Sequence, residues 1–400
     1  WTSCSPFPQG PTAADILGNP NYQAISYGGY RAISRDTVPS VDQIKDDMRI
    51  LSAIDVKILR TYNTELAELP NLLKAISELK QKDSSFEMYV MVGAWINCKD
   101  AWTDHPDHTQ EDEAYNEAEV QRAVQYAKQY PDIIKMIAVG NEAMVHWATS
   151  YFVPPSVILK WVNYLQELKS KGDLPSDLWI TSSDDFAAWG GASDNYHTED
   201  LNRLIAAVDF VSMHTYAFHN SHYSPDYWYS RDPSLSKIEQ IDASMQRAGE
   251  FAIGQYNDVK QYILSLGIDK PIHIGETGWA TASNGFYGAE GSQAADEYKA
   301  KKYYDYMRKW SNENGVSCFY FEAFDEPWKD AENPMGSENH FGLFTVDGKA
   351  KYALWSSVDK GIFSGLTRNG NPIEKTINGN EDKLLVSVLP PIAPKKDINK

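Results

Sequence analysis

The sequence predicts a single α/β domain with the architecture of a (β/α)₈ TIM barrel. Short apolar runs typical of strands alternate with longer amphipathic stretches from one end of the chain to the other, which is the pattern of βα units and a parallel sheet. Eight such runs can be counted, and eight parallel strands favour a closed barrel over an open sheet. A chain of 400 residues is long enough to form one.

In chain order, the predicted strands cover residues 24–30, 56–61, 88–93, 136–140, 179–182, 210–214, 272–275 and 318–321. The helices between them carry start and stop signals. Ser40 and Gln43 form a capping box before an apolar stripe that begins at Ile44. A second stripe begins at Val157 after two prolines, and Gly172 predicts its end.

The predicted barrel covers residues 24–358 and follows an N-terminal extension of residues 1–23. Beyond it the helical periodicity weakens, and three prolines followed by lysines predict a C-terminal tail or linker over 359–400. No apolar run is long enough to span a membrane. The chain begins at Trp1, which favours a processed and exported protein, secreted, periplasmic or at the cell surface, with its targeting segment absent.

The charge balance argues against polyanionic partners. The chain has 55 acidic and 37 basic residues, a net charge of −18, which disfavours binding to nucleic acid or to an anionic membrane. A neutral ligand fits, although the acidity could equally be a solubility trait. The aromatic content of 12% suits carbohydrate binding, because sugar C–H faces pack on flat rings. Most of these rings will still be core.

No metal centre is predicted. The three cysteines, Cys4, Cys98 and Cys318, cannot all pair with one another, and neither they nor the histidines have metal-ligand spacing. Cys318 lies in an apolar strand and is expected to be buried. A disulfide between Cys4 and Cys98 stays an open alternative.

Two glutamates follow predicted strands. In a (β/α)₈ barrel, catalytic groups emerge from the C-terminal ends of the strands, where Glu142 follows the fourth and Glu276 the seventh. Retaining hydrolysis of a glycosidic bond needs one acid to protonate the leaving oxygen and one carboxylate to attack the anomeric carbon, roughly 5 Å apart. A lone glutamate after a strand is usually a solvated loop residue, but two on facing strands favour a catalytic pair. The nearby Gly140 and Gly275 would let backbone and sugar approach closely.

The segments around these glutamates resemble the catalytic motifs of glycoside hydrolase family 17, in clan A, which includes bacterial endo-β-1,3-glucanases (laminarinases). They read Val-Gly-Asn-Glu-Ala (139–143) and Ile-Gly-Glu-Thr-Gly-Trp (274–279). Three further stretches agree with the family: Leu-Arg-Thr-Tyr (59–62), Ser-Met-His-Thr-Tyr (212–216) and Phe-Glu-Ala-Phe-Asp-Glu-Pro-Trp-Lys (321–329). The resemblance covers roughly residues 24–355.

The resemblance implies an endo-acting, retaining hydrolase of laminarin-type β-1,3-glucan that uses no metal and no organic cofactor. Glu142 would be the acid/base, Glu276 the nucleophile and Asn141 a partner of the sugar 2-hydroxyl. Tyr216 and Arg60 would keep the nucleophile ionised, since a donor or a positive charge beside a carboxylate lowers its pKa. The acid/base needs the opposite, a pKa raised by a carboxylate neighbour and apolar walls.

Further sugar contacts are predicted near the strand tips. By resemblance, Glu322 and Lys329 would bind sugar hydroxyls. The alternative is that Glu322 belongs to a structural ion pair and that Lys329 is a surface lysine. Candidate sugar platforms, each with ordinary packing as the alternative, are Tyr30, Phe218, Trp279 and Trp328, followed by Trp147 and Trp189. His214 and His273 lie inside strands and are expected to be core histidines with satisfied hydrogen bonds.

Alternatives to hydrolysis stay open at this point. β-1,3-Glucanosyl transfer uses the same two carboxylates as hydrolysis, and a catalytically inactive glucan-binding protein could keep the fold. The loop between Trp95 and Tyr115, rich in Asp and His, does not match the plant enzymes in length and could line or block one end of the cleft. We expect a monomer.

Overall fold

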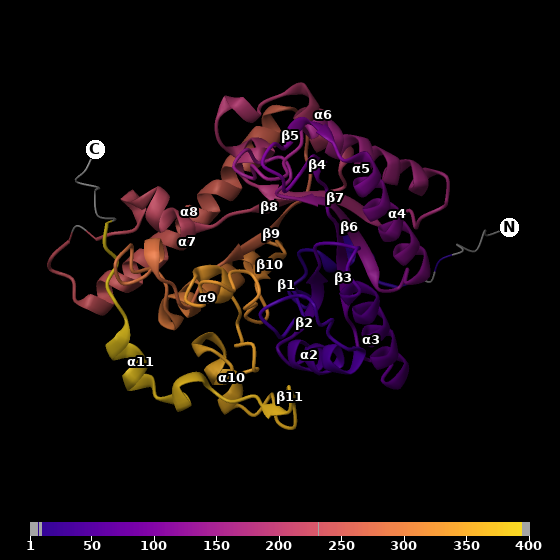
Figure 1. Ribbon diagram of the computed structural model, residues 1–400. Helices are drawn as coiled ribbons and strands as arrows, with labels where there is room; N and C mark the ends of the chain where they lie inside the picture. The colour runs from indigo at the N-terminus through magenta and orange to yellow at the C-terminus, as the bar shows by residue number, and fades with distance from the viewer. Residues whose placement is uncertain (1–6, 8–9, 231, 394–400) are drawn as a thin grey trace.

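Eight parallel strands close into a barrel in the computed structural model of the protein, which describes residues 7, 10–230 and 232–393 (Figure 1). The strands are β1 (Gln23–Ser26), β2 (Val56–Arg60), β3 (Tyr89–Ala94), β6 (Ile134–Asn141), β7 (Trp179–Asp185), β8 (Val211–His214), β9 (Ile272–Gly278) and β10 (Cys318–Phe321). Around the barrel their order is β1, β10, β9, β8, β7, β6, β3, β2. The predicted (β/α)₈ barrel is confirmed.

All eight predicted strands are found, and their ends differ by a few residues. β9 continues through Glu276 to Gly278, because Thr277 and Gly278 still pair with β10. β1 is shorter than predicted and ends at Ser26. Beyond it, Tyr27 still donates its backbone N–H to Arg60, but the chain then leaves the sheet to line the barrel mouth.

Helices cover the outside of the barrel. Ser40 and Gln43 form the predicted capping box of α2 (Val41–Ala53). The second predicted helix is α5 (Pro155–Ser170), and Gly172 follows it with φ +81°. The remaining α-helices around the barrel are α3 (Glu68–Lys82), α4 (Glu113–Gln129), α6 (Glu199–Ala207), α7 (Ala217–Tyr223), α8 (Lys237–Ser265) and α9 (Glu297–Glu313).

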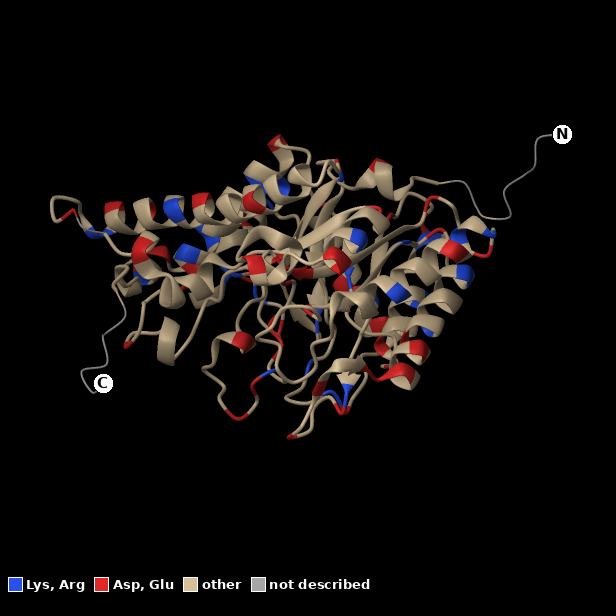
Figure 2. Ribbon diagram, turned by 90° about the horizontal axis from the view of Figure 1, so that it is seen from above, with Lys and Arg blue, Asp and Glu red and all other residues tan. Residues whose placement is uncertain are grey.

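Shorter elements connect these helices and strands. A hairpin of β4 (Cys98–Lys99) and β5 (Asp107–Glu111) follows β3. A π-helical turn lies at Ala187–Gly191, and turns of 3₁₀ helix lie at Asp194–Tyr196, Pro225–Tyr227, Gly285–Tyr287, Ser337–Asn339, Tyr352–Leu354 and Thr376–Gly379. Acidic residues are spread over the outer helices and loops, with basic residues among them (Figure 2). The net charge is thus carried by many elements rather than by one segment.

The N-terminal end of the barrel is closed by apolar packing. Helix α1 (Ala13–Ile16) places Ala13 and Ile16 in a buried cluster with Ile58, Met136 and Phe210 from the lower ends of the strands. The predicted N-terminal extension therefore plugs the barrel from below. The opposite end, where the strands finish, is open to a ligand.

The prediction of a C-terminal tail from residue 359 is wrong as far as Val388. After α10 (Trp355–Asp359), the chain forms the hairpin β11 (Thr367–Arg368) and β12 (Asn371–Pro372) and then α11 (Glu381–Ser387). Arg368 is fully buried and pairs with Asp47 of α2 at 2.8 Å, and Leu384 and Val388 are buried too. The helical periodicity of this segment is weak because it packs as loops and short elements rather than as long helices. Residues 394–400 lie outside the described part.

Cys98 and Cys318 are both buried, free thiols, as expected for Cys318. Cys4, the other half of the disulfide considered from the sequence, lies outside the described residues. Across the described chain, no helix combines the length and the apolar character needed to cross a membrane.

Candidate active site

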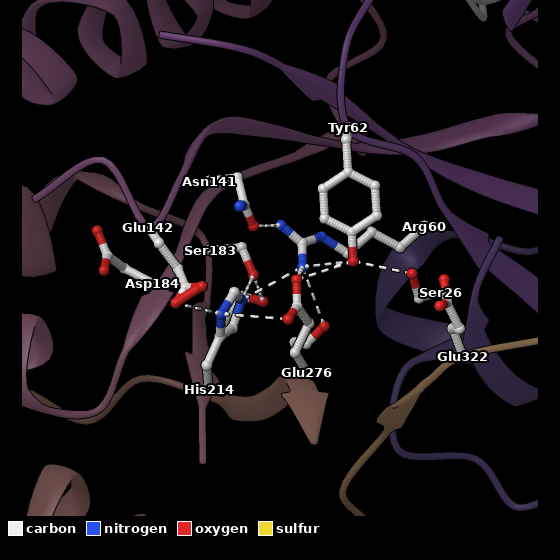
Figure 3. A network of polar contacts seen from close by, with 12 residues as sticks. Ser26, Arg60, Tyr62, Asn141, Glu142, Ser183, Asp184, His214, Glu276 and Glu322 are labelled. Carbon is white, nitrogen blue, oxygen red and sulfur yellow. Dashed lines mark hydrogen bonds and ion pairs between the residues drawn. The ribbon is translucent and has the colours of Figure 1, made fainter. Parts of the chain in front are cut away.

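Two carboxylates meet at the open mouth of the barrel. Glu142 directly follows β6, and Glu276 lies within β9, where it pairs with His214 of β8. One side-chain oxygen of each glutamate and a ring nitrogen of His214 lie within 4.8 Å of one another (Figure 3). This separation suits a retaining pair, whose carboxyl groups lie roughly 5 Å apart.

The chain turns sharply where it leaves β6, and β7 holds the turn. Gly140 has φ +80° and Glu142 φ +45°, in the left-handed region that residues other than glycine seldom adopt. The backbone N–H of Glu142 donates to the carbonyl of Ser183 at 2.9 Å, and that of Met144 donates to the carboxylate of Asp184 at 2.8 Å. The neighbouring strand thus fixes where the Glu142 side chain begins.

The two glycines near the glutamates serve the packing of the protein itself. Gly140 supplies a left-handed turn. A Cβ on Gly275 would lie only 2.1 Å from the hydroxyl oxygen of Ser212 and 2.3 Å from that of Ser183. Close approach of a sugar, the role suggested from the sequence, is not needed to explain either glycine.

Glu276 is buried and held by three donors. Arg60 Nη1 and the Tyr62 hydroxyl donate to its Oε2 at 2.7 and 2.8 Å, and the Tyr216 hydroxyl donates to Oε1 at 2.5 Å. Burial alone would raise the pKa of Glu276, but the charges of His214 and Arg60 and the two hydroxyl donors lower it to about 2. The group is therefore an ionised carboxylate at neutral pH, as a nucleophile must be.

Arg60 also orients Asn141. Its second terminal nitrogen donates to the Asn141 side-chain oxygen at 2.6 Å (Figure 3). Asn141 lines the cleft, and with its oxygen occupied its amide N–H groups are left to face a ligand. The family resemblance assigned Arg60 and Tyr216 to Glu276 and Asn141 to the sugar, and the structure brings all three residues together beside Glu276.

His214 is not the satisfied core histidine that the sequence suggested. Its Nε2 lies 2.6 Å from the Ser183 hydroxyl, but Nδ1 lies 3.8 Å from a carboxylate oxygen of Glu142 and of Glu276 and has no hydrogen-bond partner. It therefore stands between the two glutamates. The signal was its position in the motif of residues 212–216, where it lies two residues before Tyr216, which was already expected in the site.

His273, in contrast, behaves as predicted. Its Nδ1 accepts the backbone N–H of Ser317 at 2.9 Å, and complete burial lowers the pKa of His273 to about 4. It is a neutral core histidine away from the barrel mouth.

Two aspartates beside Glu142 were missed by sequence reasoning. Burial, with the charge of Glu142 as a further contribution, raises the pKa of Asp184 to about 8, although hydrogen bonds from backbone N–H groups oppose the shift. The same two causes hold the pKa of Asp185 well above its usual range. Glu142 thus has two buried carboxyl groups as neighbours. The signal was the pair of acids that ends the run Thr181 to Asp185 at a strand tip.

An open cleft of about 1290 Å³ runs across the barrel mouth. Of the predicted platforms, Tyr30, Trp147 and Trp328 line it. The assignments of Phe218, Trp279 and Trp189 as platforms are wrong, because all three rings are fully buried. The indole N–H groups of Trp279 and Trp189 donate to the backbone carbonyls of Ala294 and Ser212, and Phe218 packs against Trp279 at 5.4 Å between ring centres.

Lys329 and Glu322 occupy different layers of the site. Lys329 lines the cleft, with its Nζ 3.2 Å from Glu326 and 3.8 Å from Glu322. Glu322 is buried behind it and does not line the cleft, and burial, together with the charge of Glu326, raises its pKa well above the usual range. Direct contact of Glu322 with sugar is therefore a wrong prediction. Glu326, which the sequence did not single out, lines the cleft instead.

The spacing of Glu142, His214 and Glu276 would also allow a metal ion. Both oxygens of Glu276 already accept hydrogen bonds, one of them from the guanidinium of Arg60 at 2.7 Å. A dication there would be repelled by that guanidinium charge. The donor set fits an ionised nucleophile better than a metal ligand.

Comparison with known proteins agrees with this geometry. A sequence profile of the BtgE/BtgC glycoside hydrolase domain matches residues 24–342. The chain belongs to this glycoside hydrolase family. The curated relatives align with this chain over only part of their own length. A probable glucan endo-1,3-beta-glucosidase, btgC, from Aspergillus clavatus is 25% identical over 325 residues, 79% of this chain and 39% of that protein. The chain spans about two fifths of the length of the first curated relatives.

Solved structures show a near full-length match. An endo-laminarinase from Formosa Hel1_33_131 is 62% identical, and the alignment covers 97% of this chain and 99% of that one with a TM-score of 0.94. A glycoside hydrolase family 17 β-1,3-glucanosyltransferase from Rhizomucor miehei is 18% identical, with 83% of this chain and 96% of that one covered and a TM-score of 0.57. This second likeness concerns the fold alone.

Proposed function

We propose that this BtgE/BtgC-type chain is an endo-β-1,3-glucanase of glycoside hydrolase family 17, which hydrolyses laminarin-type glucan with retention of configuration. The observation that carries the proposal is the pair Glu142 and Glu276, with carboxylate oxygens within 4.8 Å at the floor of an open cleft. The 62% identity to a structure described as an endo-laminarinase supports the choice of substrate.

In the first step, Glu276 attacks the anomeric carbon while Glu142 gives its proton to the glycosidic oxygen, so that the C–O bond breaks and the shortened glucan leaves. A glycosyl ester on Glu276 results. In the second step, Glu142 takes a proton from a water molecule, and the water oxygen displaces Glu276 from the anomeric carbon. Both carboxyl groups return to their starting protonation states.

The surrounding residues suit these two roles. The donors on Glu276 keep it ionised for attack, and they can stay in place as the ester oxygen regains its charge in the second step. Asn141, fixed by Arg60, is assigned to the sugar 2-hydroxyl. Asp184 holds the backbone N–H of Met144 and thereby helps to fix the segment that carries Glu142.

The test is hydrolysis of laminarin by the wild-type chain and by Glu276→Gln, followed as reducing ends, with lichenan and cellulose as alternative substrates. We expect cleavage of laminarin into a series of short oligosaccharides and its loss in Glu276→Gln. Full turnover by the variant would refute the role of Glu276 as nucleophile. An inactive wild-type chain that still binds laminarin would indicate a glucan-binding protein. Products longer than a supplied laminarihexaose would indicate transfer instead of hydrolysis.

A further inference from the structure

The hairpin β4–β5 brings an exposed tryptophan into the cleft. The sequence left open whether the loop from Trp95 to Tyr115 lines or blocks one end, and in the structure Trp95, Trp102 and Tyr115 line it. The side chain of Trp102 is 60% exposed. Exposed apolar surface that gathers along a cleft is typical of a ligand-binding groove.

Trp102 is the outer member of a built aromatic stack. Its ring lies 5.1 Å from that of Tyr151 at an angle of 21°, and Trp95 lies 4.9 Å from Tyr151 on the same cluster. The indole N–H groups of Trp95 and Trp102 both donate to the side-chain oxygen of Asn97, at 2.8 and 3.1 Å. Their polar edges are therefore satisfied by the protein, and the exposed face of Trp102 is left free.

The stack is attached to the segment that follows Glu142. The Tyr151 hydroxyl donates to the backbone carbonyl of Asn141 at 3.2 Å, and the backbone N–H of Trp102 donates to the carbonyl of Ser150 at 2.9 Å. Trp102 has φ +66°, a strained conformation for a bulky residue that persists only where its surroundings impose it. The ring is thus held in one place relative to the acid/base.

We propose that Trp102, backed by Trp95 and Tyr151, is a sugar-binding subsite for the part of a β-1,3-glucan that leaves after cleavage. This inference rests on the proposed function. Because Glu142 protonates the leaving oxygen, the sugars of the leaving portion extend past Glu142. The stack is hydrogen-bonded to the segment that follows Glu142 in the chain. Trp147, also 60% exposed and lining the cleft, lies on the same segment and offers a second apolar face.

Two other aromatic residues that line the cleft, Tyr30 and Trp328, have different surroundings. The indole N–H of Trp328 donates to Glu326 at 3.1 Å, and the guanidinium of Arg35 lies 4.3 Å from the centre of the Trp328 ring. Charged groups thus flank Trp328, whereas Trp102 presents an exposed apolar face. A flat ring accepts pyranose C–H faces without reading individual hydroxyls, so the subsite binds glucan chains of any length that reaches it.

The experiment compares wild type with Trp102→Ala and Trp102→Phe on two substrates. Laminarin extends beyond the cleavage point, whereas a 4-nitrophenyl β-laminaritrioside carries only an aryl leaving group. For Trp102→Ala we expect kcat/KM on laminarin to fall about tenfold, the effect of losing one aromatic contact, mainly through KM, with a smaller loss on the aryl substrate. Trp102→Phe should recover much of the loss on laminarin.

Ile33→Ala is the matched control, because Ile33 is 71% exposed and does not line the cleft, so its activity should equal that of wild type. Equal losses on both substrates, or no loss on laminarin in Trp102→Ala, would overturn the subsite while leaving the proposed glucanase intact. A wild-type chain without activity on laminarin would overturn both.

Discussion

Removing one hydroxyl from the nucleophile's surroundings tests how the protein keeps Glu276 ionised. In Tyr216→Phe the ring stays and the donor 2.5 Å from Glu276 Oε1 is lost. A hydrogen bond to a charged group contributes about 1.5–3 kcal/mol, and one pKa unit corresponds to about 1.4 kcal/mol. The pKa of Glu276, lowered to about 2 in the wild type, should therefore rise by about one to two units.

The assay is kcat/KM on laminarin as a function of pH, since its acid limb reports the ionisation of the free enzyme. We expect the limb to move upward by about one to two pH units in Tyr216→Phe. Tyr287→Phe is the control, because Tyr287 lines the cleft without a hydrogen bond to Glu276, and its limb should not move. Tryptophan fluorescence at each pH verifies that the chains stay folded.

Stability gives a second readout of the same change. Because the pKa of Glu276 is depressed from 4.5 in its reference state to about 2, the stability it contributes is present above about pH 4.5 and is lost as the pH falls through about 2. The deficit of Tyr216→Phe in free energy of unfolding should therefore shrink as the pH falls through this window. An unmoved acid limb, or an equal movement in Tyr287→Phe, would refute the reasoning.

Three further changes have expected outcomes. Tyr62→Phe should move the acid limb less than Tyr216→Phe in the same pH profile, because Arg60 still donates to the same oxygen of Glu276; a larger movement would contradict this. Asp184→Ala frees the Met144 N–H and should lower kcat on laminarin more than it changes KM, and an effect on KM alone would argue against its positioning of Glu142. Arg368→Met breaks a fully buried pair with Asp47 and should lower the free energy of unfolding, measured in urea, by about 3 kcal/mol. An unchanged midpoint of urea unfolding would show that this pair adds no stability.

The barrel and the proposed catalytic pair were accessible from the sequence for a physical reason. Strands of a parallel barrel are buried on both faces and read as apolar runs, so a polar residue at the end of such a run marks the open mouth. Glu142 and Glu276 both stood at such ends. Arg60 and Tyr216 were assigned to Glu276 by the resemblance to family 17 and not by this rule.

What was missed depends on closure of the barrel in space. His214 lies within an apolar strand and looks like core until β8 and β9 pair and bring it beside Glu276. Asp184 reaches the segment of Glu142 only because β7 lies next to β6. Trp279 stood at a strand tip as Trp328 did, but its ring turns into the protein, and no pattern in the sequence reports on which side of a loop a ring lies.

The central claim is that Glu142 and Glu276 form a retaining pair, and the configuration of the first product tests it most directly. The reducing ends released from laminarin are followed by proton nuclear magnetic resonance from the first minutes of reaction, before mutarotation mixes the anomers. The account predicts that the β-anomer appears first, because two displacements restore the configuration of the β-1,3 bond. Initial release of the α-anomer would mean a single displacement by water and would contradict the role of Glu276 as nucleophile.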